Sequence, residues 1–310
     1  MIVDILLLVL GFAMLVKGAD WFVEGASGIA DKMHIPQLVI GLTIVAMGTS
    51  APEAAVSITA ALEKSAELSV GNVVGSNILN ILIILGLCAV ITPVAVAKTT
   101  IRYEIPIMLI ATALLVLFGM TGGEIVWWEA LILLVCFALY LFYMFVMVKR
   151  GEMQAEKTET GNKRLWLLMV MGVVGLALIV LGSRFTVDSA TALANRFNVP
   201  EKFIGLTVVA LGTSLPELFT SVVAAKKGKA DIAIGNIVGS NIFNILMILG
   251  ITGVIIDVPF ESSFLIDCGI AAFAGILLWL CVFRKKKLKL IDGIIMLASY
   301  AAYFVYLVVK

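Results

Sequence analysis

The sequence predicts an all-α polytopic membrane protein with ten transmembrane helices, arranged as two inverted five-helix repeats. Three observations predict this fold: an apolar composition, ten long apolar runs and a duplicated block of sequence. Of the 310 residues, 62% are hydrophobic and only 14% are charged, whereas about 25% are charged in an ordinary soluble domain. This composition excludes a soluble globular protein and a disordered chain. The formal net charge of +1 also excludes a nucleic-acid binder built on a basic surface.

Ten apolar runs of about the length of a transmembrane helix follow one another along the chain. In order, they lie near 2–17, 38–62, 69–94, 103–119, 126–148, 165–183, 203–225, 231–256, 262–283 and 288–309. A long polar stretch, 149–164, separates the fifth run from the sixth and is predicted to be a solvated linker. The chain therefore divides into two five-helix halves, 1–148 and 165–310.

The second and third runs of each half carry the same pattern. Residues 41–61 and 205–225 are identical at 13 of 21 positions, and residues 69–86 and 233–250 at 13 of 18. Both matches are ungapped and share one offset of 164 residues, so the chain is a duplication. The α-repeats built on these blocks are predicted to span 37–94 and 201–257.

Positive charges predict the orientation of the helices, because short cytoplasmic loops are rich in Lys and Arg. With ten alternating helices, one side of the membrane receives 17 of the 22 Lys and Arg residues, and the other side receives 5. The rich side, which contains the linker 149–164, is predicted to be cytoplasmic, with both termini extracellular. Because each half has an odd number of helices, the repeats must be inverted, as in many secondary transporters.

Glu53 and Glu217 occupy equivalent positions in the two blocks, each about fifteen residues into an apolar run. An ionisable side chain at this depth costs about 2.5–3.5 kcal/mol on insertion scales and needs a partner inside the protein. No Lys or Arg lies within the apolar stretches of the two blocks, so a bound cation is the expected partner. Oxygen ligands favour a hard cation such as Ca²⁺ or Na⁺. The alternative is a protonated glutamate bonded to a neighbour.

Other oxygen-bearing side chains follow the same helical spacing as the glutamates. Each stripe has the i, i+4, i+8 pattern of one helix face. The stripes are Thr49, Glu53 and Ser57; Asn72, Ser76 and Asn80; Thr213, Glu217 and Ser221; and Asn236, Ser240 and Asn244. Four such stripes could converge on one cavity, although Ser, Thr and Asn in membrane helices also serve as interhelical hydrogen-bonding groups.

Proline and glycine mark the same region of both blocks. Pro52 and Pro216 each remove a helix hydrogen bond one residue before the glutamate, which makes nearby carbonyls available as ligands. These carbonyls are expected near Gly48 and Gly212, and at neighbours such as Ala46 and Ala210. The small-xxx-small pairs Gly71/Gly75 and Gly235/Gly239 predict close helix approach.

The motifs GTSAPE and GNVVGSNILN, with their counterparts GTSLPE and GNIVGSNIFN, resemble the paired α-repeats of the cation/calcium exchanger superfamily. The nearest branch is that of the prokaryotic sodium/calcium exchangers. The resemblance implies a secondary-active antiporter, not an enzyme, that exchanges Na⁺ for Ca²⁺ by alternating access, with electrogenic Ca²⁺ export across the plasma membrane. Ca²⁺ and Na⁺ are then transported ions in a lipid bilayer, and no cofactor, ATP or nucleic acid is expected. The family also implies that the first and sixth helices slide past the core.

The resemblance also implies ion ligands in both repeats. Glu53 and Glu217 match the glutamates that bind Ca²⁺ and share Na⁺. The other matching ligands are Thr49, Ser50, Ser76, Asn80 and the Ala46 carbonyl in the first repeat, and Thr213, Ser214, Ser240 and the Ala210 carbonyl in the second. Asn244 stands where some relatives carry Asp, which leaves two acids in the site and predicts that K⁺ is not transported.

Two other transport functions remain open from the sequence. A Ca²⁺/H⁺ or other cation/H⁺ antiporter could use the same glutamates. Its branch usually carries a glutamate in the GN motif, and no acid follows Gly71-Asn72 or Gly235-Asn236. A cation channel is disfavoured by the inverted duplication. The chain has no nucleotide-binding loop and no HExxH or GxGD motif, which argues against an ATP-driven pump and an intramembrane enzyme.

Overall fold

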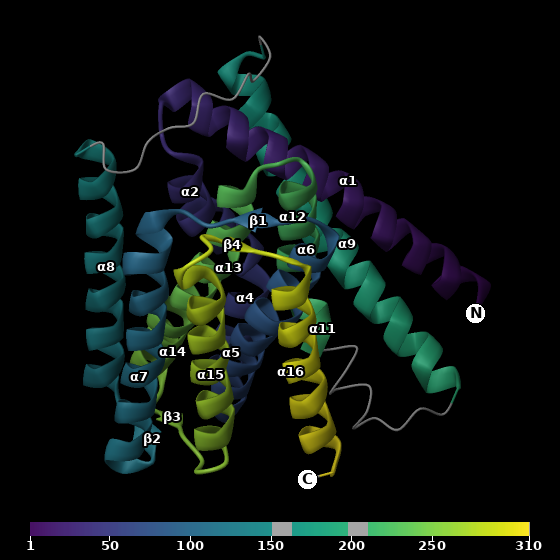
Figure 1. Cartoon of the computed structure of the whole chain (residues 1–310). Helices are drawn as coiled ribbons and strands as arrows, with labels where there is room; N and C mark the ends of the chain where they lie inside the picture. Colours follow the sequence, from purple (N-terminus) through teal and green to yellow (C-terminus); the bar gives the residue numbers. More distant parts are fainter. Residues whose placement is uncertain (151–162, 198–209, 310) are drawn as a thin grey trace.

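The computed structural model describes residues 1–150, 163–197 and 210–309, which are almost entirely helical (Figure 1). The first half contains α1 (Ile2–Met33), α2 (Gln37–Ile40), η1 (Gly41–Val45), α3 (Ala46–Thr49), α4 (Ala51–Leu62), α5 (Glu67–Leu79), η2 (Asn80–Leu85), α6 (Gly86–Ile91), η3 (Thr100–Glu104), α7 (Ile105–Gly122) and α8 (Trp127–Lys149). The second half contains α9 (Leu165–Arg196), α11 (Ala210–Thr213), α12 (Leu215–Lys226), α13 (Ala230–Phe243), η5 (Asn244–Ile248), α14 (Leu249–Ile255), α15 (Phe264–Phe283) and α16 (Leu290–Val309). Segments labelled η are π-helical.

The membrane-spanning character predicted from composition is confirmed. Within the described ranges, eight helices are long and apolar enough to cross a membrane, and the bent pair 37–49 and 51–62 makes a ninth. The predicted run 203–225 begins outside the described residues, and its described part is α11 and α12. Most of the predicted linker 149–164 and the start of the predicted α-repeat 201–257 also lie outside the described residues.

The helices α1 and α9 are longer than the apolar runs that predicted them. The runs end near residues 17 and 183, where charged side chains begin, but the helices continue to Met33 and Arg196. Asp20 lies in this continuation of α1 and pairs with Lys17 and Lys227. A hydropathy run therefore marks the apolar part of such a helix and not its end.

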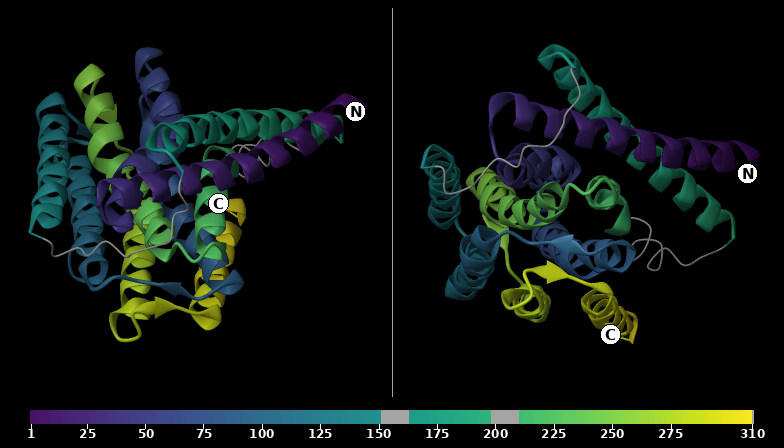
Figure 2. Two further views of the ribbon diagram at one scale, coloured as in Figure 1. Left: turned by 90° about the horizontal axis from the view of Figure 1, so that it is seen from above. Right: turned by 45° about the horizontal axis from the view of Figure 1, so that its top comes forward.

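The helices α1 and α9 pack against each other in antiparallel fashion. A Cβ added to Gly18 would lie 2.8 Å from the Gly175 carbonyl oxygen, and a Cβ added to Gly175 would lie 2.8 Å from that of Gly18. Only glycine permits this backbone approach. In both views of Figure 2, α1 and α9 run side by side across the outside of the other helices.

Four two-residue strands, which an all-α prediction does not include, connect loops at the two ends of the molecule. β1 (Val94–Ala95) pairs antiparallel with β4 (Lys287–Leu288), and β2 (Glu124–Ile125) pairs antiparallel with β3 (Val258–Pro259). The two short sheets lie at opposite ends of the helices in Figure 1. Each sheet joins a loop of one half to a loop of the other.

The helix that carries Glu53 is broken one turn before the glutamate. It ends at Thr49 and resumes at Ala51, with a bend of 48° between the two parts. Ser50 at the break has φ −81° and ψ 8°, and Ser214 at the equivalent break has φ −87° and ψ 3°. Both prolines lie in the first turn that follows, where a missing N–H costs no helix hydrogen bond. The irregularity expected next to Pro52 and Pro216 is therefore present, but the prediction that each proline removes a helix hydrogen bond is wrong, because the helix is already broken at Ser50 and Ser214.

Candidate cation site

Glu53 and Glu217 lie in the first turns of α4 and α12, and each is only 1% exposed. The N-terminus of a helix favours a negative charge, because its unpaired N–H groups carry partial positive charge. The serine at each helix break reaches the glutamate of the opposite block. Ser50 Oγ donates to Glu217 Oε1 at 2.8 Å, and Ser214 Oγ donates to Glu53 Oε1 at 3.5 Å. The two blocks therefore meet at their glutamates.

The second oxygen of each carboxylate has no partner among the described residues. Glu53 Oε2 and Glu217 Oε2 are buried and accept no hydrogen bond. No described Lys or Arg forms an ion pair with either glutamate. A buried carboxylate oxygen without a donor is costly, so it requires a proton or a cation.

Two asparagines add a second pair of oxygens without partners. Asn80 Nδ2 donates to Asn241 Oδ1 at 2.9 Å, and Asn244 Nδ2 donates to Asn77 Oδ1 at 3.0 Å. These bonds use the amide nitrogens and leave Asn80 Oδ1 and Asn244 Oδ1 buried without a donor. The four oxygens of the glutamates and asparagines are thus acceptors only, which is the chemistry that a hard cation needs.

The asparagines are held by contacts that are reciprocal between the blocks. Asn77 Nδ2 donates to the Asn241 carbonyl at 3.2 Å, and Asn241 Nδ2 donates to the Asn77 carbonyl at 3.1 Å. Asn80 and Asn244 begin the π-helical segments η2 and η5, a form of helix that is frequent at functional sites. Asn77 and Asn241 were not among the predicted site residues. Their presence in the GSN triplet of both repeats was the signal that could have identified them.

Several predicted ligands of the first repeat lie against the second repeat. Thr49 Oγ1 donates to Asn236 Oδ1 at 2.9 Å. Ser50 Oγ lies 2.9 Å from Ser240 Oγ, which in turn donates to the Ala46 carbonyl at 3.4 Å. The hydroxyls and the carbonyl expected around the glutamates are therefore in contact with one another.

The Asn72 and Asn236 stripes support the glutamates through the backbone. Asn72 Nδ2 donates to Ser57 Oγ at 2.9 Å and to the Glu53 carbonyl at 3.2 Å. Asn236 Nδ2 makes the equivalent bonds, to Ser221 Oγ at 2.9 Å and to the Glu217 carbonyl at 3.5 Å. These four side chains hold neighbouring helices together at the depth of the site.

The carbonyl expected to be free near Gly212 is occupied. Ser183 Oγ on α9 donates to the Gly212 carbonyl oxygen at 2.8 Å. The residue equivalent to Ser183 in the first half is Ala19, which has no hydroxyl to offer Gly48. Thr213 is half-buried at the end of α11, and Ala210 begins that helix.

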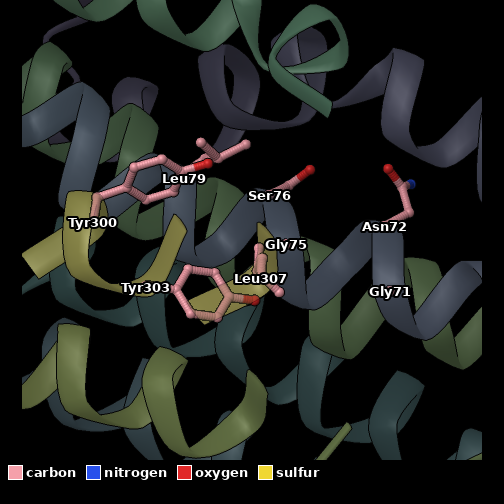
Figure 3. A pocket seen from close by; sticks show the side chains of 8 residues that line it. All are labelled: Gly71, Asn72, Gly75, Ser76, Leu79, Tyr300, Tyr303 and Leu307. Carbon is pink, nitrogen blue, oxygen red and sulfur yellow. The ribbon is translucent and has the colours of Figure 1, made fainter. Parts of the chain in front are cut away.

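Ser76 lies apart from the contacts that its counterpart Ser240 makes. It is buried next to a cavity of about 220 Å³, lined by Gly71, Asn72, Gly75, Ser76, Leu79, Tyr300, Tyr303 and Leu307. In Figure 3, Asn72 and Ser76 project from α5, while Tyr300 and Tyr303 come from α16. The cavity brings open space to one edge of the candidate site.

The close approach predicted for Gly71 and Gly75 is not found among the described residues. Within these ranges, a Cβ on Gly75 would meet nothing within 4 Å, and a Cβ on Gly71 would meet only the Phe264 ring at 3.6 Å. Positions 202 and 206, which correspond to Leu38 and Leu42 at the offset of 164, lie outside the described residues. The prediction is confirmed in the second repeat, because a Cβ on Gly239 would lie 2.5 Å from the Leu42 carbonyl oxygen. Among the described residues, the motif therefore borders a cavity in the first repeat and a neighbouring backbone in the second.

Comparisons with known proteins agree with this arrangement. Residues 3–146 and 167–309 match the family described as sodium/calcium exchanger protein. CaxA of Alkalimonas amylolytica is 38% identical over 318 residues, covering 98% of both chains, and the sodium/calcium exchanger MaX1 of Methanosarcina acetivorans is 32% identical, also covering 98% of both. The solved structure of the sodium–calcium exchanger NCX_Mj superposes with a TM-score of 0.85 at 32% identity, covering 99% of both chains. The chain therefore belongs to the sodium/calcium exchanger family, whose members are membrane transporters and not enzymes.

Proposed function

We propose that this protein exchanges Na⁺ for Ca²⁺ by alternating access, with the ions bound between the two blocks at Glu53 and Glu217. The observation that carries the proposal is the set of four buried acceptor oxygens without donors, two from these glutamates and two from Asn80 and Asn244. Oxygen ligands with two negative charges suit Ca²⁺ and Na⁺. The relatives support the same ions: MaX1 is named a sodium/calcium exchanger, and NCX_Mj structures are described as soaked with Na⁺, Ca²⁺ or Sr²⁺.

The proposed ligand set is the one that the resemblance implies. Besides the glutamates, it comprises Thr49, Ser50, Ser76, Asn80 and the Ala46 carbonyl, with Thr213, Ser214, Ser240, Asn244 and the Ala210 carbonyl. The contacts of Ser50 and Ser214 with the glutamates, and of Ser240 with Ser50, support this set.

Charge explains how the two ions are coupled. Two ionised glutamates carry −2, which one Ca²⁺ or two Na⁺ neutralises. The empty site carries an uncompensated charge that crosses the bilayer poorly, so loaded states switch and the empty state does not. A third Na⁺ leaves the loaded site at +1, so three-for-one exchange moves net charge and can drive Ca²⁺ export.

The proposed architecture is two inverted repeats, 1–148 and 165–310, with ten helices, a cytoplasmic linker at 149–164 and both termini outside the plasma membrane. The reciprocal contacts between Asn77 and Asn241 are those of a two-fold axis between the blocks. The offset of 164 residues relates the β1–β4 sheet to the β3–β2 sheet, and these lie at opposite ends of the helices. An inverted repeat has this geometry.

The test is Ca²⁺ uptake into proteoliposomes that are loaded with Na⁺ and diluted into Na⁺-free or Na⁺-matched buffer at equal pH. Uptake only with the outward Na⁺ gradient supports Na⁺/Ca²⁺ exchange. Uptake that ignores Na⁺ and follows an imposed pH gradient contradicts it and indicates a Ca²⁺/H⁺ antiporter. Unitary currents in voltage-clamped bilayers would instead indicate a channel.

A further inference from the structure

The offset of 164 residues that relates the two blocks also relates α1 to α9. Gly11 corresponds to Gly175 and Gly18 to Gly182. Their contacts are reciprocal: a Cβ on Gly11 would lie 2.9 Å from the Gly182 carbonyl oxygen, and a Cβ on Gly182 would lie 2.8 Å from that of Gly11. At the same offset, Arg184 on α9 corresponds to Asp20 on α1.

The C-terminal ends of α4 and α12 correspond in the same way. Glu63 caps α4 with φ −87° and ψ 6°, and Lys227 caps α12 with φ −80° and ψ 3°. The equivalent positions therefore carry opposite charges in both places. Asp20 in the first half corresponds to Arg184 in the second half, and Glu63 corresponds to Lys227.

One of the two possible pairs is formed. Lys227 Nζ lies 2.6 Å from Asp20 Oδ1 and donates to the Asp20 backbone carbonyl at 3.1 Å. Lys17 Nζ, one turn earlier on α1, lies 3.3 Å from Asp20 Oδ2. The ion pair joins α1 to the turn that follows α12.

The symmetry-related pair is open. Glu63 and Arg184 are both exposed, and in the described parts of the chain neither forms an ion pair with the other or with any third residue. The two pairs also belong to opposite ends of the molecule. The span 67–91 runs from the Glu63 turn to β1, and the span 230–255 runs from the Lys227 turn to β3, so Lys227 lies at the β1–β4 end and Glu63 at the β2–β3 end.

We propose that Asp20–Lys227 and Glu63–Arg184 are alternating latches: the first holds the described conformation and the second holds the opposite-facing one. In a transporter built of inverted repeats, the opposite-facing state results when the two repeats exchange conformations, so a contact made by one repeat is then made by its counterpart. This inference rests on the proposed alternating access. The opposite charges at equivalent positions make both latches attractive.

The latches act on the balance between the two states and not on ion binding. Exposed ion pairs of this kind shift a two-state equilibrium by up to about fivefold. A small bias suits a carrier that must leave each state rapidly. Asp20, Lys227, Glu63 and Arg184 are therefore positioning residues.

The test measures the populations of the two states directly. In a variant with Cys88, Cys136, Cys268 and Cys281 replaced, spin labels at Leu62→Cys and Phe197→Cys report the distance between the ends of α4 and α9. Both positions are exposed, at 68% and 73%. Asp20→Asn should raise the population with the shorter distance by up to about fivefold, and Glu63→Gln should lower it by a similar factor. Lys226→Gln, next to Lys227 and also exposed, is the matched control and should change neither population.

A charge exchange distinguishes a latch from a general effect of lost charge. Glu63→Gln lowers the short-distance population, and the double variant Glu63→Arg with Arg184→Glu should restore it. Shifts in the same direction for Asp20→Asn and Glu63→Gln, no shift for either, or no restoration by the exchange would overturn the proposal. Disulfide formation in Glu63→Cys with Arg184→Cys is a second measurement that needs no ion pair. This disulfide is expected to form in a fraction of the molecules that retain Asp20, and in a larger fraction when Asp20→Asn is added. Its absence in both proteins would also refute the latch.

Failure of the latch is distinguishable from failure of the proposed exchange. If the wild type exchanges Na⁺ for Ca²⁺ but the variants show no population shifts, the latch is refuted and the proposed function stands. If the variants show the shifts but the wild type has no Na⁺-dependent Ca²⁺ uptake, the latch stands and the assignment of the ions is refuted.

Discussion

At the scale of single residues, Glu53 and Glu217 supply all of the ionisable charge of the candidate site. Replacing Glu217 by Gln leaves Ca²⁺ with one carboxylate and a net charge of +1 in a buried site. Breaking a buried charge pair costs about 3–5 kcal/mol, so Ca²⁺ binding should weaken at least about a hundredfold and exchange should stop. The measurement is the initial rate of Na⁺-dependent Ca²⁺ uptake, with size-exclusion chromatography to establish that the variant is folded. Glu261→Gln, at an exposed loop residue, is the control; normal transport by Glu217→Gln would refute the site.

The side chain of Asn244 differs from the glutamates in its hydrogen bonding, because its amide nitrogen donates a hydrogen bond while its amide oxygen accepts none. Asn244→Asp removes the bond to Asn77 Oδ1, which is 3.0 Å long, and sets two acceptors against each other. An unsatisfied buried group costs about 1–3 kcal/mol, so the new carboxyl should retain a proton that it must lose to bind a cation. Transport by this variant should therefore depend on pH more steeply than transport by the wild type. Uptake at pH 6 and pH 8 checks this, and an unchanged pH profile would make Asn244 a packing residue only.

At the scale of elements, one motif has different described surroundings in its two copies. Gly239 on α13 lies against the backbone of η1, whereas Gly75 on α5 lies beside a cavity. Gly239→Ala forces a Cβ within 2.5 Å of the Leu42 carbonyl oxygen and should destabilise the protein by about 1–3 kcal/mol. Gly75→Ala should be tolerated, because no described residue lies within 4 Å of its Cβ. Thermal unfolding in detergent compares the two; equal losses of stability would show that Gly75 is packed as closely as Gly239.

The same elements explain how much of the fold and site the sequence could predict. The apolar runs, the duplication and the depth of the glutamates follow from residue type and spacing alone, because burying charge in a bilayer is costly. The full lengths of α1 and α9 did not follow, because hydropathy marks only the apolar part of a helix and the charged residues beyond it continue the helix. The helix that lies against Gly239 could not be predicted either, since the motif does not reveal its neighbour.

At the scale of the whole molecule, the proposed stoichiometry predicts a response to membrane potential. Three Na⁺ leaving a proteoliposome as one Ca²⁺ enters moves one positive charge outward. An inside-positive potential should therefore accelerate Ca²⁺ uptake, because one charge crossing 100 mV is worth about 2.3 kcal/mol. A K⁺ gradient with valinomycin sets the potential, and the same gradient without valinomycin is the control, which also shows whether K⁺ itself is transported. Two-for-one exchange would give uptake that is indifferent to the potential, since a site carrying −2 is then neutral with either load and no net charge crosses the bilayer in a cycle.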